Sequence, residues 1–226
     1  MKPPHPTAAA VEVAAMSTLL LSYIWLWEDS FDGAFYLCLA LYLGIGVAGH
    51  LRRGETARDI GLRVDNLGPA LRQALAFVGP LVLISPIVGL ALDTIRIPAW
   101  ATWWSFPGAA KQLASGTLQQ YGMLCSFYRK LQELIPGTWP PLMAAAGLFA
   151  LFHLPNPFLT AVTFGAGILS CWLYRRVPNL WALGLSHTVL SMSISRCLPL
   201  GITMHMRVGP GYLRAVRQAS GAVLGL

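Results

Sequence analysis

The most informative part of the chain runs from Gly147 to His187 and reads GLFALFHLPNPFLTAVTFGAGILSCWLYRRVPNLWALGLSH. It contains two histidines, His153 and His187, each set inside an apolar run. An imidazole at membrane depth is costly unless it faces a protein interior or a water-filled cavity. The segment therefore predicts membrane helices that enclose a polar site.

The composition of the whole chain indicates a membrane protein. Of its 226 residues, 55% are hydrophobic and 11% are charged, whereas soluble domains carry about 25% charged residues. Several apolar runs approach the roughly 20 residues that a membrane helix requires. We expect an all-helical, polytopic membrane bundle of about seven or eight transmembrane helices, with residues 1–226 forming a single integral membrane domain.

Proline, glycine and charged residues divide the chain into seven predicted helices. These cover residues 8–27, 34–51, 70–92, 109–134, 141–154, 158–174 and 180–198. The fourth is more polar than the others and ends before Pro136. For the tail that begins at Pro199 the sequence leaves three possibilities, which are a span, a re-entrant segment and an interfacial helix.

The distribution of charge predicts the orientation. Basic residues follow the second and sixth helices, at 52–63 and 175–176, and lie near the end of the fourth, at 129–130, whereas an acidic turn at 28–32 follows the first. The positive-inside rule places the arginines and the N-terminus in the cytoplasm. The net charge is +7, and we expect membrane lipids as partners. No basic-aromatic patch favours nucleic acid.

Glu12 is an unusual acid inside the first apolar run. We expect it to lie near the lipid headgroups, with a position facing the bundle as the alternative. The four cysteines lie in or beside apolar segments without a Cys-x-x-Cys pair, which indicates buried free thiols. They are Cys38, Cys125, Cys171 and Cys197.

We expect no cofactor and no metal. The chain has no His-Glu-x-x-His pattern, and two histidines alone rarely hold catalytic zinc. Met204, His205 and Met206 carry donors that suit a soft metal such as copper(I). We interpret this triplet as an ordinary part of the tail.

Helical spacing adds a neighbour to each histidine. Positions four apart share a helix face, so Phe149 is expected beneath His153 and Ser191 beside His187. A single histidine in an apolar helix is more often a packing residue than a catalytic one. Two on separate helices favour a common site.

These residues and their surroundings resemble one known family. The chain looks like a member of the CAAX protease and bacteriocin-processing (CPBP, or Abi) family of intramembrane proteases, related to the CAAX prenyl endoprotease. The family pattern is Glu-Glu-x-x-x-Arg, Phe-x-x-x-His, and His-x-x-x-Asn or His-x-x-x-Asp, each on its own helix. Phe149 to His153 matches the second part, and His187 matches the third with Ser191 at its end. The resemblance covers about residues 109–195.

The first part of the pattern is degenerate. Gln119 and Gln120 stand where the two glutamates belong, and Leu124 replaces the arginine. In the family, a glutamate held by the histidines is thought to activate water for attack on a peptide carbonyl. A neutral amide has no basic site near neutral pH, and loss of a general base slows a reaction by about 10²–10⁴.

The resemblance implies an endopeptidase that cleaves a membrane-proximal peptide with a non-standard site. Gln119 or Gln120 would position water or substrate. His153 would act as the base or as an oxyanion donor, since an imidazole titrates near neutrality. His187 and Ser191 would hold the oxyanion.

Phe149 and Met123 are the expected substrate contacts, and the resemblance implies a multi-pass protein of the bacterial plasma membrane. The alternative function is a catalytically inactive pseudoprotease that binds a peptide or a lipid-modified segment. A small-solute transporter is less favoured, because the sequence shows no inverted repeat of broken helices.

Overall fold

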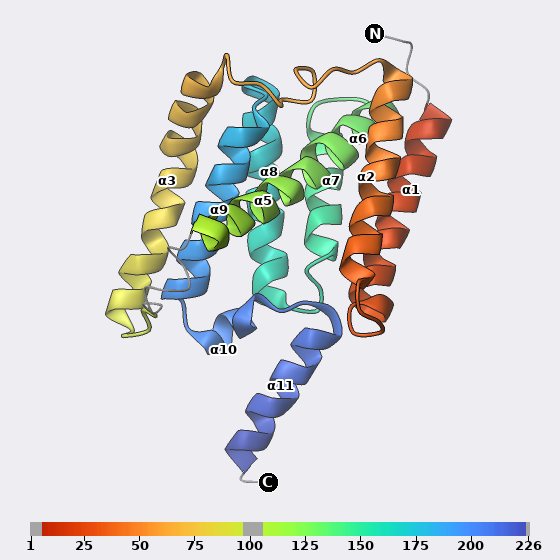
Figure 1. Ribbon diagram of the computed structural model, residues 1–226. Coiled ribbons are helices and arrows are strands. Elements are labelled where there is room, and N and C mark those ends of the chain that lie inside the picture. Colours follow the sequence, from red (N-terminus) through yellow and green to blue (C-terminus); the bar gives the residue numbers. More distant parts are fainter. Residues whose placement is uncertain (1–5, 97–105, 225–226) are drawn as a thin grey trace.

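The computed structural model of the chain describes residues 6–96 and 106–224, and all regular structure in these ranges is helical (Figure 1). The predicted all-helical membrane bundle is thereby confirmed. The helices are α1 (Pro6–Ser22), η1 (Tyr23–Trp27), α2 (Ala34–Arg53), α3 (Leu67–Ala91), α5 (Phe106–Gln120), η2 (Tyr121–Tyr128), α6 (Arg129–Leu134), α7 (Trp139–Leu151), α8 (Pro157–Arg176), α9 (Leu180–Cys197), α10 (Leu200–Thr203), η3 (Met204–Met206) and α11 (Gly209–Leu224).

Within the described residues, four helices are long and apolar enough to cross a membrane. They are α1 with η1, α2, α3 and α8. Helix α7 is apolar but has 13 residues. Helices α5 and α9 carry several polar side chains, which lower their hydropathy. Helix α9 lies among the apolar helices, whereas α5 crosses the face of the bundle, and more than half of residues 108–120 are exposed (Figure 1).

The two ends of the bundle differ as the charge pattern predicts. The loops after α2, α6 and α8 lie at one end, and the turn after η1 lies at the other with α10 and α11 (Figure 1). Helix α11 extends away from the bundle rather than packing along it. It is tied to the acidic turn by an ion pair of 2.6 Å between Arg214 and Asp29.

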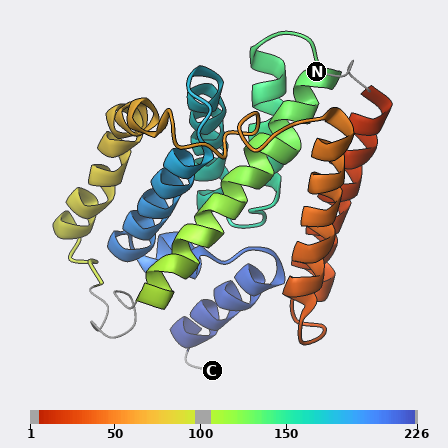
Figure 2. The ribbon, with the colours of Figure 1, turned by 45° about the horizontal axis from the view of Figure 1, so that its top comes forward.

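Helix α5 continues through η2 into α6 and crosses the bundle obliquely (Figure 2). Its crossing with α9 is close because small residues meet there. A Cβ atom added to Gly116 would collide with the Thr188 hydroxyl, and one added to Gly184 would collide with the Thr117 hydroxyl. This reciprocal contact holds the C-terminal half of α5 against the middle of α9.

The π-helix η2 follows Gln120 directly. All eight of its residues are buried, including Leu124, for which the resemblance implies an arginine in the family pattern. Short π-helical segments often occur at functional sites.

Helices α7 and α8 also approach closely, because Gly167 lies against Ala146.

Two buried asparagines fix the starts of the helices that follow. Asn156 accepts a hydrogen bond from the Leu159 amide at the start of α8, and Asn179 accepts one from the Ala182 amide at the start of α9. Both asparagines are fully buried. Such N-caps contribute about 0.5–2 kcal/mol each and set the register of the two helices.

The expectation that Glu12 lies near the headgroups is wrong, because this side chain faces the bundle and is 3% exposed. Its carboxylate pairs with Arg52 and Arg53 of α2 and lies 3.4 Å from the Lys130 ammonium of α6. Arg53 also pairs with Glu133. Three cations therefore compensate one buried acid, which permits its burial.

A second group of ionic contacts lies beside the first, at the same end of the bundle. Glu55 accepts hydrogen bonds from His50 (2.6 Å) and from Arg129, and the other ring nitrogen of His50 contacts the Tyr121 hydroxyl at 3.0 Å. Burial opposes ionisation of Glu55. The hydrogen bonds from His50 and Arg129, with the charge of Arg129, outweigh burial and lower the pKa of this carboxyl to about 2.

Candidate functional site

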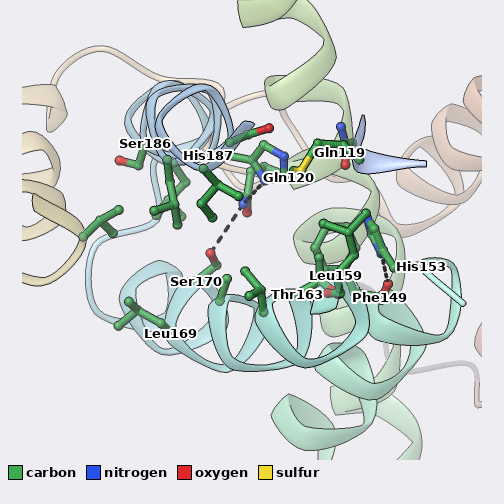
Figure 3. A pocket seen from close by; sticks show the side chains of 18 residues that line it. Gln119, Gln120, Phe149, His153, Leu159, Thr163, Leu169, Ser170, Ser186 and His187 are labelled. Atoms are coloured by element: carbon green, nitrogen blue, oxygen red, sulfur yellow. Dashed lines mark hydrogen bonds between the residues drawn. The ribbon is translucent and has the colours of Figure 1, made fainter. Parts of the chain in front are cut away.

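A cavity of about 160 Å³ lies among α5, α7, α8 and α9 (Figure 3). The five residues that the sequence singles out for catalysis all line it, together with Phe149. Its polar lining is neutral and consists of amides, imidazoles and hydroxyls. These polar residues are Gln119, Gln120, His153, Thr163, Ser170, Ser186, His187 and Ser191.

The two glutamines have different surroundings. Gln120 is 3% exposed, and its Nε2 donates to His187 Nδ1 at 3.2 Å and to the Ser170 hydroxyl at 3.4 Å (Figure 3). Its Oε1 has no hydrogen-bond partner among the described residues. An orphaned acceptor in a cavity wall suits a substrate N–H group. Gln119, the residue before Gln120, is exposed and also lines the cavity.

The hydrogen bonds assign a tautomer to each imidazole. The Nδ1 of His153 lies 2.6 Å from the Phe149 carbonyl oxygen, which only accepts, so Nδ1 carries the proton and Nε2 is basic. The Nδ1 of His187 accepts from the Gln120 amide, so its Nε2 carries the proton. One histidine is thus arranged as a base and the other as a donor.

Phe149 lies between the two histidines. Its ring centroid is 4.9 Å from that of His153 and 6.2 Å from that of His187. Figure 3 shows His153 and Phe149 on one side of the cavity, with Gln120 and His187 across from Ser170. Ser191 lines the cavity one turn after His187, as the helical spacing predicts.

A second cavity of about 390 Å³ adjoins the first. It lies among α1, η1, α2, η2 and α7, and its lining is mostly aromatic and aliphatic. Met123, an expected substrate contact, lines this second cavity rather than the first and is 1% exposed. The two cavities share four lining residues, which are Gln119, Phe149, His153 and Met206.

No carboxylate lines either cavity among the residues that the structure describes. The buried acids Glu12 and Glu55 are held by cations at the arginine-rich end. In residues 6–96 and 106–224, no three His, Cys, Asp or Glu side chains cluster as a metal site would require. The chemistry available in the cavity is therefore that of imidazole, amide and hydroxyl groups.

Twelve of the 18 lining residues were not expected from the sequence, and three of these are polar: Thr163, Ser170 and Ser186. No motif marks these hydroxyls, and of the three only Ser170 contacts Gln120. Met206 comes from the tail, beyond the last predicted helix. The four cysteines are buried and free, as expected.

Residues 101–193 match the family model described as type II CAAX prenyl endopeptidase, Rce1-like. Over these residues, the chain is similar to the Rce1-like family. The matched residues correspond closely to the core of about 109–195 that the motifs predicted, and they contain the helices that line the polar cavity. The match and the four apolar helices support an integral membrane protein that resembles an intramembrane protease.

A further similarity is to the vasopressin V1b receptor of Mus musculus, at 29% identity over 146 residues. These residues make up 59% of this chain and 32% of the receptor, so the chain spans about a third of the curated protein that it matches. The similarity assigns no activity to this chain. No solved structure matches.

Proposed function

We propose that this Rce1-like protein is an intramembrane endopeptidase that cleaves a membrane-proximal peptide and uses His153 as its general base. The hydrogen bond from His153 Nδ1 to the Phe149 carbonyl carries this proposal, because it leaves the basic Nε2 of an imidazole at a cavity without carboxylates. Gln119, Gln120, His187 and Ser191 complete the proposed site.

The reaction would proceed in two proton transfers. His153 Nε2 takes a proton from a water molecule while the water oxygen attacks the carbonyl carbon of the peptide. The Nε2–H of His187 and the hydroxyl of Ser191 donate to the oxyanion that forms. The imidazolium then gives its proton to the amide nitrogen as the C–N bond breaks, which regenerates the neutral histidine.

The glutamines would bind rather than transfer protons. Gln120 fixes the tautomer of His187 through the 3.2 Å hydrogen bond and offers Oε1 to a substrate N–H group. Gln119 would orient the attacking water or the peptide. Phe149 and Met123 would contact apolar parts of the substrate.

The alternative function is a pseudoprotease in the same cavity. Two observations favour it: no carboxylate lines the described cavities, and the buried Leu124 leaves the position of the family's arginine without charge. Such a protein would bind a membrane-proximal peptide without cutting it. We propose the plasma membrane of a bacterium as the location in either case.

The discriminating experiment is a cleavage assay with the full chain in lipid vesicles and a panel of membrane-proximal peptides. We expect slow cleavage by the wild type and a loss of at least roughly 10²-fold in His153→Ala, the usual effect of removing a general base. His205→Ala is the matched control, because His205 is exposed and lines neither cavity.

The double variant Gln119→Glu/Gln120→Glu separates the two functions. If the wild type binds peptides but does not cut, and the double variant cuts, the protein is a pseudoprotease that lacks only its base. If the wild type cuts and His153→Ala cuts equally fast, His153 is not the base and the proposed mechanism is wrong.

A further inference from the structure

Met206 stands out among the four residues that line both cavities. Gln119, Phe149 and His153 belong to the core that matches the Rce1-like family, whereas Met206 lies beyond it, between α10 and α11. On one side of Met206 is the neutral polar cavity, and on the other is the larger apolar one. These four side chains form the wall that the two cavities share.

The backbone around Met206 has an unusual conformation. Met204, His205 and Met206 have φ values of 46°, 55° and 59°, so three consecutive residues with side chains are left-handed. This conformation is unfavourable because the Cβ atom approaches the following carbonyl oxygen. Such strain persists only where the surrounding structure holds it, and it often marks a functional position.

One buried side chain holds both ends of this left-handed turn. The Nδ2 of Asn156 donates to the carbonyl oxygens of Thr203 and Arg207, each at 3.1 Å. The Gly209 amide donates to the Leu154 carbonyl oxygen at 2.9 Å. Asn156 is fully buried and lies three residues after His153. The turn that carries Met206 is thus tied to the loop that carries His153.

The apolar cavity has the size and lining for one large side chain. Its walls include Phe35, Tyr42, Met123 and Phe127. Apolar side chains gain free energy in proportion to the area that they bury. An aromatic or long aliphatic side chain fits this lining, whereas a charged one would find no opposite charge there.

We infer that Met206 is a specificity-determining residue. It separates the polar cavity, where the peptide bond would lie, from an apolar subsite between α1, α2 and α7. The occupant of this subsite is the large apolar side chain beside the cleaved bond. The inference deepens the proposed endopeptidase function and rests on it for the reaction, while the partition itself can be tested without catalysis. The flexible thioether of Met206 adapts to occupants of different shape.

The native Cys38 provides a direct test, because it lines the apolar cavity and is 4% exposed. The full chain in vesicles is reacted with a small and with a bulky maleimide, and mass spectrometry follows the modification of each cysteine. We expect Met206→Ala to speed modification of Cys38 by the bulky reagent by roughly tenfold, the scale of discrimination by a methylene or two in an apolar pocket.

Met204→Ala is the matched control, since Met204 lies in the same left-handed turn but lines neither cavity. Cys171, which is fully buried and lines neither cavity, reports general loosening of the bundle. The inference is overturned if Met206→Ala leaves Cys38 modification unchanged, or if Met204→Ala speeds it equally. It is also overturned if Met206→Ala raises the modification rate of Cys171 by the same factor as that of Cys38.

Two further variants keep the test decisive if Met206→Ala does not fold. Met206→Leu preserves the volume and should keep the wild-type rate of modification, while Met206→Phe should slow it. With cleavable peptides, Met206→Ala should shift the preference toward larger side chains beside the cut bond. If the wild type cuts no peptide, the proposed function fails, and the rates at Cys38 still decide whether Met206 forms the partition.

Discussion

The arginine-rich end of the bundle and the polar cavity differ in how their buried polar side chains are compensated. At that end, Glu12 and Glu55 are buried against arginines and a lysine, so full charges are matched by full charges. In the cavity, imidazoles meet amides and hydroxyls, and no described acid takes part. The chain can therefore bury carboxylates where cations compensate them, but it has none where the family pattern needs one.

The comparison shows that the polar groups of the proposed site converge although no described carboxylate lies among them. Gln120 contacts His187, the histidine that the family's glutamate would approach, and it does so as a hydrogen-bond donor. That hydrogen bond requires the tautomer of His187 that carries its proton on Nε2. His153 then presents the basic Nε2 nitrogen at the cavity, which is why the proposed function depends on that residue.

The largest expected effect concerns the charged end. Replacing Glu12 with Gln leaves Arg53 and the fully buried Lys130 without their shared acid. Breaking a buried ion pair from one side costs about 3–5 kcal/mol. We expect the free energy of unfolding to fall by this amount in Glu12→Gln, as measured by chemical denaturation in detergent micelles.

The matched control for this change is Asp32→Asn, because Asp32 is exposed at the opposite end. It should leave the unfolding free energy nearly unchanged. Equal effects of the two substitutions would show that the network around Glu12 contributes no particular stability.

A smaller effect is expected where the cavity depends on helix packing. In Gly184→Ala, the added methyl group would collide with Thr117 and push α9 away from α5. Overpacking of this kind costs about 1–3 kcal/mol, and cleavage or peptide binding should fall with it because Gln120 then loses contact with His187.

Gly165→Ala is the control for that substitution, since nothing lies within 4 Å of the added methyl group. Thermal unfolding of both variants checks the prediction. If Gly184→Ala were as stable and as competent in binding as Gly165→Ala, the close crossing of α5 and α9 would not position the site.

The smallest expected effect is a dependence of stability on pH at the charged end. Because the pKa of Glu55 is lowered to about 2 in the folded protein, its ionised form stabilises the fold at pH values above its unfolded pKa of about 4.3. That contribution should disappear as the pH falls from about 5 to about 2.

The size of this contribution is about 1–2 kcal/mol after allowance for partial solvent screening at the loop. Denaturation series at several pH values, on wild type and Glu55→Gln, measure it as a difference. The Gln variant should be less stable than the wild type at pH 7, and the two should converge in acid. A constant difference across this range would exclude Glu55 as the titrating group.

Local sequence patterns predicted the helices and six of the residues that line the cavity, because helical period and motif spacing act over a few turns. Phe149 beneath His153 and Ser191 beside His187 follow from that spacing. Contacts between distant segments did not follow. The cations around Glu12 come from α2 and α6, and Met206 enters from the tail.

The central claim is that His153 supplies the basic nitrogen of the cavity, and the pH dependence of kcat/KM for peptide cleavage tests it most directly. The acidic limb of such a profile reports the pKa of the group that acts as base, and burial shifts the pKa values of an imidazole and a carboxylate in opposite directions. The acidic limb of the wild-type profile should therefore move to a different pH in Gln119→Glu/Gln120→Glu, in which a carboxylate can take over. Profiles with the same acidic limb in both proteins would contradict the account.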